Sequence, residues 1–292
     1  MVWRFKNSIK KLFILMCLIY PLTAVAHIKN ESSQFPDIEF SDSKFEIVLL
    51  VGAGIIPETP VFEPDLELSK TDLAAWAALA SGLAEGGETP DMKKLSEAAL
   101  SAGLLENLQG NASYEDINLV LFDGILTPEN PDAFPSKAEA ASFIASNLSV
   151  DVNGETLLDK REMRVGPTGE VTQVESRLNP NGGSSYYITI ANETFPLYTH
   201  GRVANGPTDL IQWNGRNVRR SFLKELGDFT LWVYLEAEPL QAVSASGTTI
   251  PAVADESAGT EPQVATNQSL LYSLVAAVLV LGAILFFRSK RS

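Results

Sequence analysis

Residues 66–83 read LELSKTDLAAWAALASGL, and this stretch decides the fold of the N-terminal part of the chain. Ser69 is a favoured helix N-cap, and Asp72 three residues later is close to a capping-box arrangement. Apolar residues then recur at helical spacing on one face, namely Leu73, Trp76, Ala77, Ala80 and Leu83. The stretch therefore predicts a capped helix over residues 70–83, ended by Gly86-Gly87.

The same order of features recurs along residues 27–150, a region rich in Ala, Leu and Glu. An apolar helix, a glycine followed by apolar residues, a loop and a Ser-capped helix occur first around IVLLVGAGII (47–56) and again around EDINLVLFDGIL (115–126). A shortened copy lies between the two. The predicted helices cover residues 44–51, 70–83, 91–102, 114–122 and 137–147. Repetition of this kind predicts stacked helical units that share one core.

This pattern resembles the S-layer homology (SLH) module over roughly residues 35–150. The matching motifs are Phe35-Pro36-Asp37-Ile38 at the opening, Gly54-Ile55-Ile56 after the first helix, Leu68-Ser69-Lys70-Thr71-Asp72-Leu73 before the second, and Phe134-Pro135-Ser136-Lys137-Ala138-Glu139 before the last. The resemblance implies tandem helix–loop–helix repeats folded as a pseudo-threefold prism.

The resemblance also implies a glycan-binding site at the starts of the capped helices. In the SLH family a signature arginine helps to hold anionic wall glycan, and Lys70 and Lys137 stand at that position here, behind Ser69 and Ser136. The middle copy has no basic residue there. Lysine keeps the charge of arginine but lacks its planar fork. Two interpretations stay open: the lysines bind a carboxylate-bearing sugar, or they screen the surrounding acidic residues.

Both ends of the chain carry segments typical of export and anchoring. Residues 1–26 combine a basic leader, a short apolar run and a small-residue stretch, which predicts a cleavable signal peptide. Residues 269–287 predict one transmembrane helix, and the basic tail 288–292 is expected to be cytoplasmic. A sorting signal that is later removed has the same pattern. Residues 238–268 predict a flexible linker, so the bulk of this single-pass membrane protein is expected to be extracytoplasmic.

Charge and cysteine content restrict the partners and the chemistry of the exported part. The chain has 22 basic and 36 acidic residues, and four of the bases lie in the leader and three in the tail, which leaves 15 against 36. Such an acidic surface disfavours nucleic acid as a partner. The one cysteine, Cys17, lies in the predicted signal peptide, so no disulfide, thiolate nucleophile or zinc–sulfur site is expected in the mature protein.

Residues 151–237 consist of short alternating runs and predict a small β domain. Strands are expected over residues 170–175, 186–191, 194–198, 211–213, 216–221 and 229–235. Asn214-Gly215 predicts a hairpin turn between the fourth and fifth of these strands. The set suggests a small barrel of SH3-like or OB-like type packed on the helices. The expected fold class is therefore α+β: an SLH-like helical module, a β-barrel-like domain, a flexible linker and one transmembrane helix.

These features favour a non-catalytic cell-envelope protein that contacts cell-wall polysaccharide or an envelope protein and needs no cofactor. The tentative ligand residues are Ser69, Lys70, Ser136 and Lys137. An alternative is an exported copper-binding protein or enzyme. Signal-peptide cleavage after Ala26 makes His27 the mature N-terminus, where its amine and imidazole can bind copper together with His200, although the polar neighbourhood of His27 is expected to fray.

Overall fold

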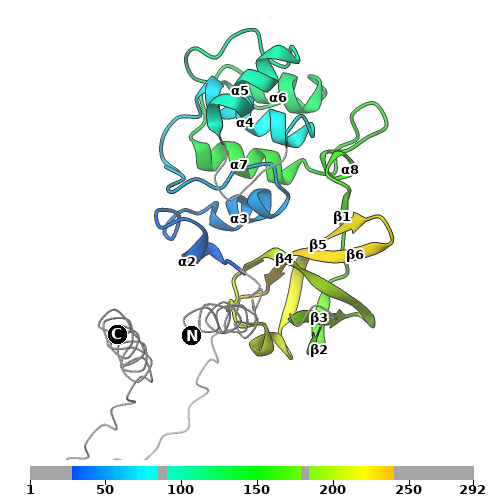
Figure 1. Cartoon of the computed structure of the whole chain (residues 1–292). Helices are drawn as coiled ribbons and strands as arrows, with labels where there is room; N and C mark the ends of the chain where they lie inside the picture. The colour runs from blue at the N-terminus through cyan, green and yellow to red at the C-terminus, as the bar shows by residue number, and fades with distance from the viewer. Residues whose placement is uncertain (1–27, 85–90, 179–183, 240–292) are drawn as a thin grey trace, which may run out of the picture. The chain divides into compact units, whose positions relative to one another are not determined.

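The computed structural model describes residues 28–84, 91–178 and 184–239 (Figure 1). The predicted signal peptide, His27, residues 240–268 of the predicted linker, the predicted transmembrane helix and the tail lie outside the described residues. Within the described ranges, no helix has both the length and the apolar character needed to cross a bilayer.

The helices precede the strands along the chain. They are α2 (Glu31–Gln34), α3 (Lys44–Gly52), α4 (Lys70–Ala80), α5 (Met92–Ser101), α6 (Tyr114–Phe122), α7 (Lys137–Ser146) and α8 (Leu157–Lys160). Helices α3 to α7 confirm the five predicted helices, with ends that differ by at most three residues. The single-turn helices α2 and α8 were not predicted, because four residues carry no periodic signal.

Helix α4 ends at Ala80, three residues before the predicted end. Gly82 has a left-handed backbone with φ of 66°, and the Leu83 N–H donates to the Ala78 carbonyl at 2.9 Å. This hydrogen bond closes a Schellman motif, which terminates a helix and satisfies its last carbonyl groups. Leu83 therefore lies beyond the helix and is 45% exposed, so its predicted place on the apolar face of this helix was wrong.

Six strands form one mixed sheet in the described part of the chain. They are β1 (Met163–Val165), β2 (Gly169–Leu178), β3 (Ser184–Ile190), β4 (Glu193–Ala204), β5 (Asn217–Leu226) and β6 (Phe229–Ala237). Their order is β1-β5-β2-β3-β4-β6, and a further β5–β6 pairing makes β2 to β6 a ring. The β4–β6 pair is parallel and the other pairs are antiparallel. The fold is therefore α+β, as predicted.

The predicted barrel is wrong, because the strands form a ring that does not close as a barrel. Strands β2 and β5 pair only at Gly169 and Glu170, near the start of β2. The β4–β6 ladder shifts its register between Leu197 and Arg202. Barrel closure needs ladders with a consistent stagger around the whole circumference, and these two junctions do not supply it.

The predicted strand at residues 211–213 is also wrong. These residues belong to the 3-10 helix η1 (Leu210–Trp213), and Asn214-Gly215 connects η1 to β5. Trp213 is fully buried, and its indole Nε1–H donates to the Pro207 carbonyl at 2.8 Å. This buried indole holds the segment in a tight turn. The hairpin of this region lies instead between β5 and β6, which pair along their length.

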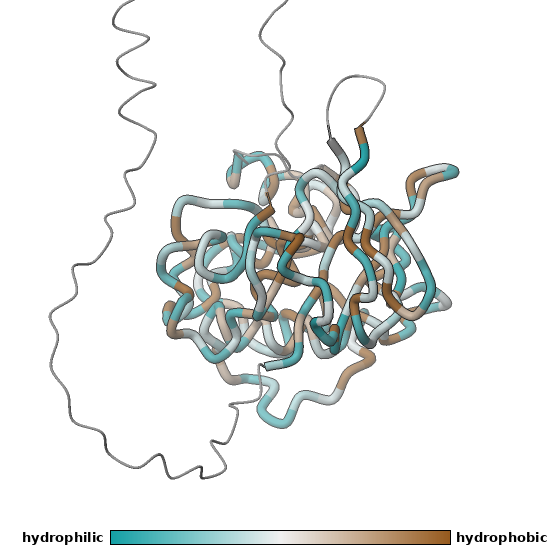
Figure 2. Tube along the Cα trace, turned by 90° about the horizontal axis from the view of Figure 1, so that it is seen from below, coloured by the Kyte–Doolittle hydropathy of each residue, from teal (hydrophilic) through white to brown (hydrophobic). Residues whose placement is uncertain are grey.

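Two clusters of buried side chains stabilise the described chain. The larger cluster joins the helices to residues of the sheet, among them Phe222, Val233 and Tyr234. The smaller one lies within the sheet and includes Trp213 and Trp232. Figure 2 shows hydrophobic stretches passing through the interior of the folded part. Because sheet residues belong to the helical core, the sheet and the helices pack as one compact unit.

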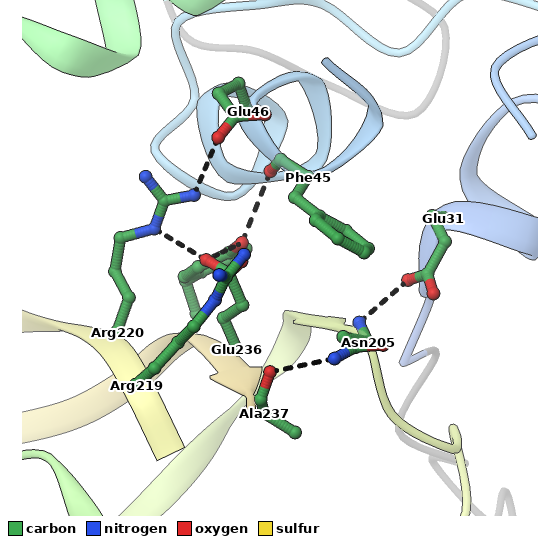
Figure 3. Close-up of polar contacts among 9 residues, drawn as sticks. Glu31, Phe45, Glu46, Asn205, Arg219, Arg220, Glu236 and Ala237 are labelled. Carbon is green, nitrogen blue, oxygen red and sulfur yellow. Dashed lines mark hydrogen bonds and ion pairs between the residues drawn. The ribbon is translucent and has the colours of Figure 1, made fainter. Parts of the chain in front are cut away.

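A buried carboxylate fixes helix α3 against strands β5 and β6 (Figure 3). Glu236 is fully buried and accepts hydrogen bonds from Arg219 Nε at 2.8 Å and Arg220 Nε at 2.6 Å. Arg220 reaches on to Glu46 of α3, with an Nη2–Oε1 distance of 3.1 Å. The Tyr234 hydroxyl lies 3.0 Å from Glu236 Oε2 and 3.2 Å from the Phe45 carbonyl, so its one proton can be donated to either.

The environment of this network shifts the pKa values of Tyr234 and Arg220. Burial raises the pKa of Tyr234, and the neighbouring Glu236 carboxylate raises it further, so the phenol stays protonated. Burial alone would lower the pKa of Arg220, but the negative groups around it outweigh that effect and raise the pKa. The arrangement satisfies a carboxylate that would otherwise be buried at high cost.

We predict that Glu236→Leu destabilises the protein by about 3 kcal/mol, because it leaves two arginines without their buried partner. This value is at the low end of the range for breaking a buried ion pair, because the side chains of Arg219 and Arg220 are partly exposed and can be solvated. Glu46→Gln is the matched control and should cost less than about 1 kcal/mol. Urea unfolding measures both values, and equal costs would contradict the central role of Glu236.

Candidate functional site

The starts of helices α4, α6 and α7 meet at one place, which we name the capped junction (Ser69–Asp72, Ser113–Asp116 and Ser136–Glu139). The Leu68 N–H donates to the Pro135 carbonyl at 2.9 Å, and the Ala112 N–H donates to the Leu68 carbonyl at 2.8 Å. The Tyr114 N–H donates to the Ala133 carbonyl at 3.1 Å. The segments before the three helices thus hold one another through backbone hydrogen bonds.

Each helix of the capped junction begins with the same capping arrangement. The hydroxyl oxygens of Ser69, Ser113 and Ser136 accept the backbone N–H three residues later, at 3.0, 3.1 and 3.2 Å. In α6 and α7 the third-residue carboxylate also accepts the N–H of the cap residue, which completes a capping box. The serine caps predicted from sequence are therefore confirmed.

The first residue of each helix faces the third-residue carboxylate of another. Lys70 Nζ lies 3.3 Å from Asp116 Oδ1, and Lys137 Nζ lies 3.4 Å from Asp72 Oδ2. Tyr114 occupies the equivalent position in α6. Burial raises the pKa of the Tyr114 hydroxyl, and the charge of Glu139 raises it further. This cyclic pattern is a pseudo-threefold feature of the junction, and Tyr114 takes the place of the third lysine.

The structure brings the four predicted ligand residues together and gives each of them an internal partner. Ser69 and Ser136 act as caps, and Lys137 also pairs with Glu63 at 2.9 Å. The side chains of Lys70 and Lys137 are 24% and 12% exposed. These ion pairs are those expected if the lysines screen nearby acids. Sequence spacing marked Asp72 as a near capping-box residue, but it marked neither Asp116 nor Glu63 and did not show which helix each lysine contacts.

A second feature is a cleft of about 660 Å³ between the helices and the sheet, which we name the interface cleft. Its lining comes from the ends of α3 and α4, the loop after α3, the end of α8, and strands β4 to β6. Of the residues that line this cleft, only His200 on β4 was a candidate site residue predicted from the sequence. None of the residues of the capped junction lines it.

Arg161 closes one wall of the interface cleft by capping two helices. Its Nε donates to the Ala53 carbonyl at 3.1 Å, and its Nη1 donates to the Leu79 carbonyl at 2.7 Å. Both carbonyls belong to C-terminal turns, where the helix dipole favours a cation. Gly54 is left-handed with φ of 68°, and a Cβ there would lie 2.8 Å from Arg161 Nη2. Gly54 therefore suits both the turn and the approach of the guanidinium.

Arg202 of β4 lies deep in the interface cleft with a side chain only 3% exposed. Its guanidinium pairs with Glu58 and donates to the His200 carbonyl. Burial lowers the pKa of Arg202, although the Glu58 charge opposes the change. The Arg202 Nε–H is buried and has no hydrogen-bond partner in the part of the chain that the structure describes. Such an orphan donor costs roughly 1–3 kcal/mol and calls for an explanation.

Glu58 connects this site to the start of the described chain. Its carboxylate pairs with Lys29 as well as Arg202. Lys29 forms a parallel bridge with Arg202, and the Val203 N–H donates to the Lys29 carbonyl at 3.0 Å. The Asn30 amide donates to the Gly206 carbonyl at 3.1 Å. Lys29 is therefore bound to β4 and Asn30 to the loop after it, although the sequence suggested that this neighbourhood frays.

Among the described residues, no group of three or more His, Cys, Asp or Glu side chains is placed to hold a metal ion.

Comparisons of the chain with protein-family models, curated proteins and solved structures find no match.

We predict a pH-dependent contribution of Glu58 to stability. Burial alone would raise the pKa of Glu58, but the hydrogen bond from Lys29 and the charge of Arg202 outweigh it and lower the pKa below 4.5. The stabilisation by Glu58 is therefore complete above the unfolded-state pKa and is lost as pH falls through the folded-state pKa. Urea unfolding should show Glu58→Gln less stable than the parent at pH 7, with the difference shrinking near pH 3. A constant difference would show that the carboxylate charge is not responsible.

Proposed function

We propose that this protein is a non-catalytic, membrane-tethered cell-envelope protein whose SLH-like helical module contacts cell-wall glycan or a neighbouring envelope protein. The convergence of three Ser-capped helices at the capped junction carries the proposal, because tandem repeats of this resemblance are expected to meet in that way. The apolar segment 269–287 and the basic leader support the tether and the export.

The lysines of the capped junction have N–H groups that can donate hydrogen bonds to a glycan oxygen. An ammonium group carries three N–H donors, and the ion pairs within the described residues engage one carboxylate at Lys70 and two at Lys137. The first-turn position adds the favourable field of a helix N-terminus. Carboxylates still outnumber lysines here, since Glu63, Asp72 and Asp116 pair with the two ammonium groups. An anionic sugar must therefore compete with these internal partners.

Retention on purified cell wall tests the proposal. We expect Lys70→Gln combined with Lys137→Gln to weaken retention on anionic wall glycan about tenfold, as the loss of charge-assisted hydrogen bonds implies. Lys70→Arg combined with Lys137→Arg keeps the charge and adds a bidentate fork, so it should retain binding. Lys93→Gln with Lys94→Gln on α5 is the exposed control.

Stability must be recorded in the same experiment, because Lys70 and Lys137 also join helices to one another. Retention is therefore compared at a temperature where circular dichroism shows every variant folded. Equal retention of the parent and the glutamine double variant would reject glycan contact through these lysines and leave the protein-partner form of the proposal.

One observation favours copper binding as a second candidate function. Lys29 forms a parallel bridge with Arg202 of β4, and this strand carries His200 two residues before Arg202. His27 itself lies outside the described residues. Neutral imidazole is a good copper ligand, and an N-terminal amine can complete such a site.

Copper titration of the mature protein separates the two candidates. Under the proposed envelope function we expect no sub-micromolar copper binding, with calorimetry as the measurement. A single tight site that disappears when one residue is added before His27, and again in His200→Ala, would favour the copper candidate instead. Adding the residue changes the terminal amine without changing β4, so it is the more selective of the two variants.

A further inference from the structure

We propose that the interface cleft binds a small organic anion, with a carboxylate or phosphate group on a partly apolar body of sugar size. This site is separate from the capped junction and goes beyond the proposed envelope function. The inference rests on three observations: the charges that line the cleft, an orphan donor on one of its lining residues, and its apolar and aromatic walls.

The cleft concentrates positive charge in an otherwise acidic protein. Its basic residues are Lys160, Arg161, Arg202 and Lys224, and its acidic residues are Glu58 and Glu162. Four cations against two carboxylates leave a positive excess, whereas the whole chain has a formal net charge of −14. These groups come from the end of α8 and the residues just after it, from β4 and β5, and from the loop after α3. An anion that enters the cleft is thus attracted locally, although the rest of the chain repels it.

Arg202 supplies the observation that points to a ligand rather than to charge balance alone. Its Nε–H is buried without a hydrogen-bond partner in the described residues, while its terminal nitrogens are held by Glu58 and the His200 carbonyl. Buried guanidinium donors are normally satisfied, since an unmade hydrogen bond to a charged group is costly. An acceptor oxygen bound in the cleft beside Arg202 would remove that cost.

The remaining lining defines the body of the ligand. Apolar side chains contribute from both sides of the cleft, namely Val51, Ile56, Pro57, Leu79, Leu226 and Val233. The rings of Tyr198 and His200 lie 5.7 Å apart at 64°, and both line the cleft. The volume of about 660 Å³ falls within the range of small-molecule sites. Aromatic and apolar surface beside clustered cations suits a sugar acid or sugar phosphate better than a bare inorganic ion.

The test uses the full-length protein in detergent and isothermal titration with glucuronate, glucose 6-phosphate, inorganic phosphate and glucose. We expect one of the two sugar anions to bind with a saturable isotherm, at least tenfold more tightly than glucose or inorganic phosphate. Tighter binding of glucuronate identifies carboxylate as the recognised group, and tighter binding of glucose 6-phosphate identifies phosphate. Absence of saturable binding by both sugar anions, or equal binding of glucose, overturns the proposal.

Variants then assign the binding to the cleft. Lys160→Gln combined with Lys224→Gln should weaken anion binding at least tenfold, while Lys93→Gln with Lys94→Gln changes it less than twofold. Arg202→Lys keeps the charge but removes the Nε donor, and should also weaken binding. If Arg202→Lys does not fold, the lysine variants alone decide. Unchanged affinity in Lys160→Gln with Lys224→Gln overturns the assignment. We expect these variants to leave retention on cell wall unchanged, because none of the residues of the capped junction lines the cleft, so the two proposals can fail separately.

Discussion

The described fold depends on buried or half-buried carboxylates that hold separate elements together. Glu236 is fully buried between two arginines, and through Arg220 it connects β6 to Glu46 of α3. Without that carboxylate, Arg219 and Arg220 would lose their shared buried partner, and α3 would lose its connection to β6 through Arg220. At the other end of the helical region, Asp72 and Asp116 each serve a helix start and a lysine from another helix. The acidic composition is therefore partly structural.

Helix α3 lies at the centre of this organisation. Its five consecutive residues Ile47 to Val51 are buried, so it has no polar face over that stretch and must be covered on all sides. The helices cover one side, and the sheet covers the other through β4 and β6. Its C-terminal turn also meets Arg161, which ties α3 to α4 and α8. The interface cleft thus exists because α3 is shared between helices and sheet.

Sequence was sufficient where the signal is local. The serine caps and the positions of α3 to α7 follow from spacing and glycine punctuation over a few residues. It failed at Trp213, whose alternating neighbours are typical of a strand, although the buried indole donates to the nearby Pro207 carbonyl and holds the segment as η1. The ion pairs of Lys70 and Lys137 could not be predicted from local spacing, because their partners lie on other helices. Arg202 gave no pattern at all, since its burial comes from tertiary packing.

Structural contacts account for only some of the basic residues in and beside the interface cleft. Arg161 has a structural reason to be there, because two helix C-termini place carbonyl groups around it. Arg202 and Lys29 share the single carboxylate of Glu58, so one negative group serves two cations. The buried Arg202 Nε–H still has no hydrogen-bond partner among the described residues. Packing alone would favour an apolar residue at such a position. A polar group retained there at this cost is better explained by recognition of an anion than by stability.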